Sequence, residues 1–315
     1  MHASHQVIPW VNLPSGSEPW TREERARVAA DVGAACRQGG FFFLRGQGHG
    51  LPPDMVDATY HEVRAFFRQP LNEKLRFNST AETQFLGYRA VGREKSRSHA
   101  GAEACEQYRI GHTTRDLGLE PSAEFFHEPF RHATALLPRL QGLGDDILAA
   151  CAVDLGLGED YFDSFMAAPM HRLGLNYYKP GQGAQLANPV DYAMSPHIDL
   201  SLFTVVTQDQ PGLQVRDVQG RWTDVPARPD ALFVLLGDYL QRWTNGAYVA
   251  ATHRVGPMAQ DRVSIQYKHR PSYSTVVEPL KPFAGEDNPL RYEPFDTGSQ
   301  YASILGSLLA EPTTP

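Results

Sequence analysis

The chain has 315 residues, 42% of them hydrophobic, and a formal net charge of −7 at pH 7. This composition suits a globular protein with one large core or two small ones. The charges are spread along the chain without a basic run, and no stretch approaches the roughly 18 apolar residues of a membrane span. We therefore expect a cytoplasmic protein with no nucleic-acid partner and no membrane partner. Its three cysteines lack a CxxC motif, which argues against a disulfide framework and a zinc knuckle.

The first part of the chain predicts two helices around a short buried strand. Thr21 and Glu24 form a capping box at the start of a helix over residues 21–36, whose apolar residues recur at helical spacing. Gly39 and Gly40 end that helix, and the run FFFL that follows them predicts a buried strand. A second helix with an apolar face is expected to begin at Pro53.

The middle and the end of the chain have different patterns. Residues 77–127 are polar and poorly periodic, and predict loops with short strands. A longer helix follows, with an apolar stripe from Leu136 to Leu155. After Leu173 the sequence consists of short β-branched or aromatic runs separated by turn residues, with a hairpin turn at residues 217–220. Helices followed by antiparallel strands predict an α+β protein with a β-sandwich or jelly-roll core.

One short motif in the strand-rich half has the residue types of a metal site. His197 and Asp199 are two positions apart in SPHIDL, so on an extended segment both side chains point to the same face. With 12 His and 36 acidic residues in 315, chance alone could produce such a triplet, and a surface pair on a strand is the alternative interpretation. The motif therefore needs a third ligand from elsewhere in the chain.

His253 is the candidate for that third ligand, because it follows a turn at Asn245 and Gly246 and precedes another strand. Two histidines and one carboxylate on one side of a metal are typical of non-haem Fe(II) sites that activate oxygen. Nine residues later, Arg262 and Ser264 share a strand face, and a guanidinium with a hydroxyl is suited to binding a carboxylate. A hydrogen bond from His253 to a carbonyl and a structural ion pair of Arg262 are the alternatives.

Several segments, taken in order, resemble one known family. IPWVNL, GGFFFLRGQGHGLP, FFRQPLNEKLRF, LGLNYYKP, PHIDLSLFTVVTQD, DALFVLLGDYLQRWTNGAYVAATHRV and RVSIQYKHRP are similar to segments of the Fe(II)- and 2-oxoglutarate-dependent dioxygenases of the isopenicillin N synthase-like group. The resemblance covers nearly the whole chain. It implies a double-stranded β-helix (jelly-roll) core with flanking N-terminal helices.

The resemblance also implies a division of the chain and roles for individual residues. The segments would be an N-terminal mixed region at 1–127, a long helix and connection at 128–172, the jelly-roll core at 173–275 and a C-terminal lid at 276–315. His197, Asp199 and His253 would bind Fe(II). The distal carboxylate of 2-oxoglutarate would be bound by Arg262, Ser264, Tyr178 and Asn176.

The implied reaction couples O2 and the decarboxylation of 2-oxoglutarate to the oxidation of an unactivated C–H bond in a small molecule. Hydroxylation, desaturation or ring formation is expected, because Asp199 is present where related halogenases have a small residue. The excess of Arg over Lys suggests a GC-rich bacterial genome and, by association, a secondary metabolite as substrate. An Fe(II) oxidase that works without 2-oxoglutarate and a non-catalytic binding protein with the same fold are the alternatives.

The substrate and the oligomeric state cannot be read from the sequence. The segment after Pro271 departs from the plant members of the family, which leaves a plant-type substrate and the nature of the lid undecided. Candidate substrate-binding residues come from the variable loops and the later strands, and they are Tyr88, Arg89, Tyr108, Arg109, Phe203, Tyr239, Tyr267 and His269.

Overall fold

The computed structural model describes residues 7–14, 20–46, 51–80, 83–95, 101–111, 129–182 and 192–308. Within these ranges no helix combines the length and the apolar character that crossing a bilayer requires. The expected boundary between residues 127 and 128 falls outside the described ranges. The division of the chain into four segments therefore stays a prediction.

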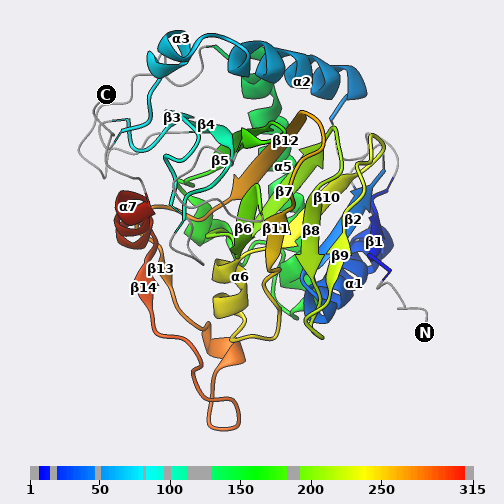
Figure 1. The fold of residues 1–315 in the computed structure, drawn as a ribbon. Coiled ribbons are helices and arrows are strands. Elements are labelled where there is room, and N and C mark those ends of the chain that lie inside the picture. The colour runs from blue at the N-terminus through cyan, green and yellow to red at the C-terminus, as the bar shows by residue number, and fades with distance from the viewer. Residues whose placement is uncertain are drawn as a thin grey trace.

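The structure combines helices and strands from both halves of the chain (Figure 1). The helices are α1 (Arg22–Gln38), α2 (Pro53–Phe67), α3 (Leu71–Leu75), α5 (Arg131–Asp154), α6 (Asp238–Trp243) and α7 (Thr297–Leu308), with 3-10 turns at Asp163–Met166 and Lys281–Phe283. The strands are β1 (Trp10–Asn12), β2 (Phe41–Arg45), β3 (Gly87–Arg89), β4 (Glu106–Gly111), β5 (Arg172–Tyr178), β6 (Met194–His197), β7 (Phe203–Gln208), β8 (Leu213–Arg216), β9 (Trp222–Asp224), β10 (Leu232–Leu236), β11 (His253–Val255), β12 (Arg262–His269), β13 (Val276–Val277) and β14 (Phe295–Asp296).

Two sheets face each other and form the jelly-roll. The large sheet has the strand order β1-β2-β10-β7-β12-β5-β4-β3, and the smaller one has the order β6-β11-β8-β9. In Figure 1 the small sheet lies in front of the large one, and α7 lies beside the β3 end of the large sheet. The α+β jelly-roll prediction is confirmed. The sequence did not reveal that β1, β3 and β4 extend the large sheet on both of its sides.

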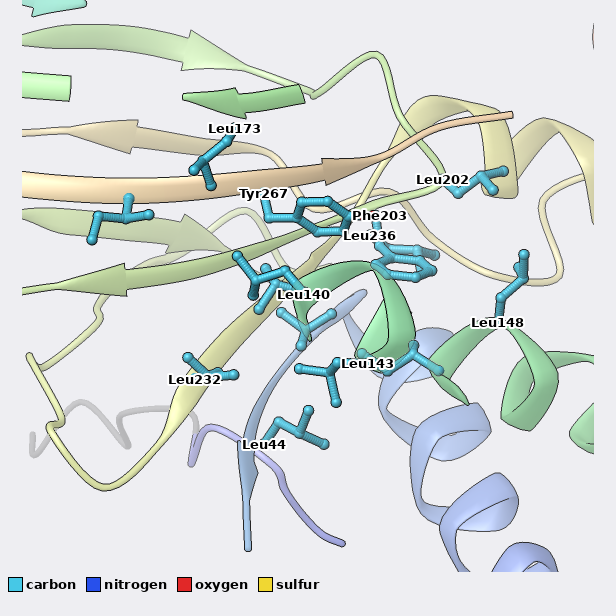
Figure 2. Packing of buried hydrophobic residues seen from close by; sticks show 14 of the residues in the cluster. Leu44, Leu140, Leu143, Leu148, Leu173, Leu202, Phe203, Leu232, Leu236 and Tyr267 are labelled. Carbon is cyan, nitrogen blue, oxygen red and sulfur yellow. The ribbon is translucent and has the colours of Figure 1, made fainter. Parts of the chain in front are cut away.

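Alternate residues of the large sheet pack into two different cores. One core lies between the sheets, where Phe43, Val206 and Phe233 contact Leu213 and Val215 of β8. The other lies between the large sheet and helices α1, α2 and α5. Figure 2 shows this second core, with leucines of α5 lying against side chains of the sheet. The face of the large sheet that meets the helices is therefore apolar along its whole width.

The predicted helix ends agree with the structure. The Thr21 side chain accepts a hydrogen bond from the Glu24 backbone N–H, and the Glu24 carboxylate accepts one from the Thr21 N–H, which is the capping box that the sequence predicts. Gly39 caps the C-terminus of α1, and α2 begins at Pro53. The hairpin turn is also confirmed, since the Gly220 N–H donates to the carbonyl of Asp217 between β8 and β9.

Two glycines of α5 provide a test of how tightly this helix packs on the sheet. A Cβ on Gly144 would lie 2.3 Å from Nδ1 of the buried His269, whereas a Cβ on Gly142 would have no neighbour within 4 Å. We expect Gly144→Ala to destabilise the protein, because overpacking costs about 1–3 kcal/mol and outweighs the gain of up to about 1 kcal/mol in helix propensity. Gly142→Ala is the matched control and should be neutral or stabilising. Chemical denaturation of both variants measures this, and equal stabilities would contradict the packing described.

Candidate active site

His197, Asp199 and His253 come together at one end of the small sheet. His197 ends β6, His253 begins β11, and the two residues are direct partners in the antiparallel pairing of these strands. Asp199 follows two residues after His197. Nε2 of His197 lies 3.6 Å from Oδ1 of Asp199, and Nε2 of His253 lies 3.9 Å from Oδ2. One ligand atom from each residue thus lies within 4.8 Å of the other two, which is close enough for one metal ion.

The hydrogen bonds of His197 and His253 involve Nδ1 and leave Nε2 of each ring available to a metal. Nδ1 of His197 lies 2.8 Å from the carbonyl of Ser195, and Nδ1 of His253 lies 3.1 Å from the carbonyl of Ala251. A carbonyl can only accept, so each Nδ1 donates this hydrogen bond, and in the neutral ring Nε2 is then the atom with a lone pair for a metal. Burial, with His197 alongside, lowers the pKa of His253 to about 3, so this ring stays neutral. Two lone pairs facing a carboxylate repel one another unless a cation lies between them, and the donor set therefore fits Fe(II).

Asp199 is oriented by two further side chains. Its Oδ1 forms an ion pair with Lys268 of β12, and its Oδ2 accepts a hydrogen bond of 2.5 Å from the Thr204 hydroxyl. Burial raises the pKa of Asp199, but the neighbouring Lys268 outweighs it and holds that pKa well below its usual range. Burial lowers the pKa of Lys268 to about 8, so the amine is largely protonated at neutral pH. The carboxylate is thus ionised and fixed in orientation.

Thr204→Val tests this orientation. The substitution keeps the shape of the side chain and removes the hydrogen bond to Asp199. Because loss of an outer partner of a metal ligand typically costs 10- to 100-fold, we expect the affinity for Fe(II) to fall by roughly that factor. Thr207→Val on the same strand is the control, because the Thr207 hydroxyl bonds to Tyr60 on the opposite face. Anaerobic equilibrium titration with Fe(II) measures both, and equal affinities would mean that the Thr204 hydroxyl does not support the ligand.

A small pocket lies between two of the three candidate ligands and Arg262. Asp199 and His253 line one end of it, and Arg262, Ser264 and Gln266 of β12 line the other. Arg262 is fully buried; its Nη2 donates to Oε1 of Gln208 at 2.6 Å and its Nε donates to the carbonyl of Gln210 at 3.1 Å. Its Nη1 has no hydrogen-bond partner among the described residues. Arg262 forms no ion pair with a carboxylate among the described residues, and a buried guanidinium with an unpaired N–H is suited to binding an anion.

The other residues predicted around Arg262 lie next to it on paired strands. Tyr178 is directly opposite Arg262 and Asn176 is directly opposite Ser264 in the pairing of β5 with β12. The guanidinium carbon of Arg262 lies 4.8 Å from the centre of the Tyr178 ring, and Nδ2 of Asn176 donates to the Tyr178 hydroxyl at 3.1 Å. All four side chains are buried. The structure therefore brings the whole predicted 2-oxoglutarate set into one polar group.

Comparison with known proteins identifies the family. The sequence profile of the 2OG-Fe(II) oxygenase superfamily matches residues 169–271. A second profile, described as the N-terminal part of the non-haem dioxygenase in morphine synthesis, matches residues 8–129. Jasmonate-induced oxygenase 2 of Arabidopsis thaliana is 30% identical over 285 residues, which cover 88% of this chain and 74% of the relative. The chain belongs to the 2OG-Fe(II) oxygenase superfamily. It is a non-haem iron dioxygenase, with Fe(II) as its metal and 2-oxoglutarate as its cosubstrate.

Two further comparisons agree with this assignment. The 2-oxoglutarate-Fe(II) type oxidoreductase ppzC of Metarhizium rileyi is 29% identical over 314 residues, covering 90% of this chain and 83% of the relative. The crystal structure of a full-length Neurospora crassa protein in complex with alpha-KG has a TM-score of 0.80 at 24% identity, and the match covers 97% of this chain and 98% of that one. The second likeness concerns the fold alone, and it extends over the whole oxygenase.

A second group of metal-binding residue types in this oxygenase does not form a metal site. Asp145, His171 and His269 also bring ligand atoms within 4.8 Å of one another. Nδ1 of His171, however, accepts a hydrogen bond from the backbone N–H of Arg270, so its Nε2 carries a proton and cannot bind a metal without breaking that bond. Asp145 is exposed and lies 3.6 Å from His269. We interpret this group as core histidines beside a surface carboxylate.

A cavity of about 870 Å3 lies between α2 and β7, and none of its lining residues is a candidate iron ligand. Tyr60 of α2 and Thr207 of β7 line it, on the side of the large sheet that packs against the helices. The chemistry of the side chains, and not the size of a cavity, therefore locates the active site of the oxygenase.

The predicted substrate residues fall on both faces of the large sheet. Arg89 and Arg109 lie on the face that carries Arg262 and Ser264, because β3, β4, β5 and β12 pair in a common register. The aromatic candidates lie in the hydrophobic core on the other side, and these are Tyr88, Tyr108, Phe203, Tyr239 and Tyr267. Figure 2 shows Tyr267 and Phe203 beside the leucines of α5. His269 stacks on Phe203 in the same core.

Several residues that the sequence did not single out belong to this site. Thr204 and Lys268 contact Asp199, and Gln208 accepts a hydrogen bond from Arg262. Lys268 could have been found from its spacing, because residues 262, 264, 266 and 268 of one strand share a face. Thr204 and Gln208 could not have been found without the pairing of β7 with β12.

Proposed function

We propose that this enzyme uses Fe(II), 2-oxoglutarate and O2 to oxidise an unactivated C–H bond of a small molecule, by hydroxylation, desaturation or ring formation. The observation that carries the proposal is the geometry of the ligand atoms. Ligand atoms of two histidines and an ionised carboxylate lie within 4.8 Å of one another, near a buried guanidinium whose Nη1 has no hydrogen-bond partner among the described residues.

Each residue has a role in this proposal. His197, Asp199 and His253 would hold Fe(II), which together with 2-oxoglutarate supplies the oxidising power when bound. Arg262 would bind the distal carboxylate of 2-oxoglutarate, with Ser264 and Tyr178 as hydroxyl partners. The His197 side chain is 18% exposed, against 8% for His253 and 5% for Asp199. We therefore expect the substrate to approach the metal from the side of His197.

The class of substrate is inferred from the names of two relatives. Of the relatives, one from Penicillium crustosum is named a clavatol oxidase and one from Glycine max a homoarginine-6-hydroxylase, and both names refer to small molecules. We propose a small molecule, and among small molecules a secondary metabolite, as substrate of this chain as well.

An Fe(II) oxidase that works without 2-oxoglutarate is the alternative function. The same three ligands would serve it. The Nη1 of Arg262, which has no partner among the described residues, favours the function that uses 2-oxoglutarate. A buried N–H without a partner is costly unless a ligand accepts its hydrogen bond.

An anaerobic absorbance titration separates the two functions. Purified protein is titrated with Fe(II) and then with 2-oxoglutarate, and the visible charge-transfer band of the chelated iron is recorded. We expect a band that requires both components, followed by release of succinate in the presence of O2. Binding of iron without a band would favour the oxidase, and absence of iron binding would overturn the enzymatic proposal.

A further inference from the structure

Five basic side chains, four of them buried and Arg109 partly buried, line the large sheet beside the candidate iron site, and we refer to them as the basic cluster. They are Arg89 of β3, Arg109 of β4, Arg172 of β5, Lys268 of β12 and Arg270 just after β12. In the strand pairing, Lys268 is opposite Arg172, Arg109 is opposite Gly174, and Arg89 is opposite Gln107. The cluster therefore occupies the face that carries Arg262 and Ser264, and Arg172, Lys268 and Arg270 lie at the far end of β12.

The backbone leaves room for these side chains. A Cβ on Gly174 would lie 2.4 Å from Nη1 of Arg109, and a Cβ on Gly111 would lie 2.8 Å from Cδ of Arg172. Both arginines thus lie across glycine positions of the neighbouring strand. Any other residue at these two positions would displace a guanidinium group, so the cluster depends on the sequence of the sheet itself.

The charges of the cluster are only partly neutralised. Nη1 of Arg89 donates to Glu94 at 2.8 Å, and Lys268 pairs with Asp199. Within the described ranges, neither Arg109 nor Arg270 forms an ion pair with a carboxylate. Nε and Nη1 of Arg270 are buried and have no hydrogen-bond partner among the described residues. Leaving buried N–H groups of a charged side chain without a partner is costly, so these two atoms are available to an anionic ligand.

The positive charge of the basic cluster lowers the pKa of Tyr301 of α7. The guanidinium carbon of Arg270 lies 4.3 Å from the centre of the Tyr301 ring, and the Arg270 side chain also donates a hydrogen bond to Tyr301, while Nε and Nη1 of Arg270 have no partner among the described residues. Burial opposes ionisation of the phenol, but Arg270, Arg172 and Arg89 outweigh it and lower the pKa of Tyr301 to about 7. A negatively charged oxygen is therefore stabilised at this point of the protein.

We propose that the substrate is an organic acid whose carboxylate is bound by the edge of Arg270, with Arg109 and Lys268 supplying further positive charge. This inference rests on the proposed function and names its substrate class. At about 3.3 Å per residue, Arg270 lies roughly 7 Å beyond Lys268 and roughly 26 Å beyond Arg262 along the strand direction. The substrate acid and 2-oxoglutarate would thus bind at opposite ends of one strand, with the iron site between them.

The test uses small anions and thermal unfolding, and does not need the natural substrate. The full chain is measured with acetate or benzoate, and with acetamide or benzamide as neutral matches, at constant ionic strength. The protein is measured in two states. One is metal-free, and the other is loaded anaerobically with Fe(II) and saturating 2-oxoglutarate, so that Arg262 is bound to 2-oxoglutarate. We expect the anions alone to raise the unfolding temperature, by roughly 2–4 °C at a tenfold excess over the dissociation constant.

Substitutions assign this effect to Arg270. Arg270→Gln should abolish the response to the anions, Arg270→Lys should retain part of it, and Arg262→Gln should retain it in the metal-free protein. Without any anion, Arg270→Gln should unfold at the same or a higher temperature than the unsubstituted protein, because an uncompensated buried charge has been removed. The exposed Arg68→Gln is the control for loss of a surface guanidinium.

Two results would overturn the proposal. One is a lower unfolding temperature of Arg270→Gln without anions, which would make Arg270 a structural partner of Tyr301. The other is an equal response of the unsubstituted protein to anions and amides. Because the anion effect is expected with and without metal, failure of the proposed function would appear separately, as absence of the iron-dependent absorbance band.

Discussion

Replacing His253 with alanine is expected to abolish tight Fe(II) binding and, with it, the charge-transfer band and turnover. His253 is buried, its Nδ1 is held by the carbonyl of Ala251, and its Nε2 faces Asp199. Loss of an outer-shell partner costs about 10- to 100-fold in metal affinity, so loss of a direct ligand should cost more than that. Anaerobic Fe(II) titration and succinate release measure the effect.

His61→Ala is the matched control for this substitution. His61 is exposed on α2, and its Nδ1 lies 2.8 Å from the carbonyl of Asp57, so it has the same kind of local hydrogen bond without any contact to the site. The control should bind iron as the unsubstituted protein does. If His253→Ala retained full iron affinity while remaining folded by circular dichroism, the three residues would not be the metal site.

Replacing Arg262 with leucine is expected to raise the KM for 2-oxoglutarate strongly while leaving Fe(II) binding intact. Removing one partner of a buried, hydrogen-bonded charge pair costs about 2–5 kcal/mol, which corresponds to roughly 30-fold to several thousand-fold in affinity. Arg262→Lys should have a KM between that of the unsubstituted protein and that of Arg262→Leu. It keeps the charge but loses the planar guanidinium that binds a carboxylate at two points. Steady-state kinetics in 2-oxoglutarate and the anaerobic titration together measure this.

Arg68→Leu is the control for the loss of a guanidinium near this strand. Arg68 is 63% exposed and its Nη2 lies 3.4 Å from Asp261, the residue that precedes Arg262. A surface pair of this kind contributes little, so the KM for 2-oxoglutarate should not change. An unchanged KM in Arg262→Leu would mean that this arginine is structural and would favour an oxidase that works without 2-oxoglutarate.

The sequence was sufficient for residues that are two positions apart on an extended segment. His197 and Asp199, like Arg262 and Ser264, were chosen because such residues share a face; β6 pairs with β11 in the small sheet, and β12 lies in the large sheet that faces it. The resemblance to a family added Tyr178 and Asn176. The capping box, the hairpin turn and the long helix were also predicted, because each depends on neighbours in the sequence.

The same rule explains what the sequence left open. Tyr88 and Arg89 are adjacent on β3, so their side chains point to opposite faces of the sheet. Tyr88 joins the core beside the helices and Arg89 faces the site, and the sequence did not show which residue would lie on which face. Strand β3 has three residues within a segment that lacks periodicity, so its register could not be derived. Arg270 was passed over in favour of its neighbour His269, although it continues the alternation that begins at Arg262.

Tyr301 could not have been predicted to lie near the site. It belongs to α7, far from the strands in the sequence, and no local pattern relates a C-terminal helix to arginines of β3 and β5. Its position depends on how the chain after β12 returns past β13 and β14 to the edge of the large sheet (Figure 1). Such long-range placement is a property of tertiary packing.

The direct pairing of His197 with His253 has a consequence for the folding of the oxygenase. Strand β6 is the edge of the small sheet and has only one neighbour among the described strands, β11, so few backbone hydrogen bonds hold it in place. A metal ion bound by both histidines acts as a crosslink between these strands, and part of its binding free energy becomes free energy of folding for the small sheet. Loss of the ion would therefore favour local opening of β6 well before the rest of the protein unfolds.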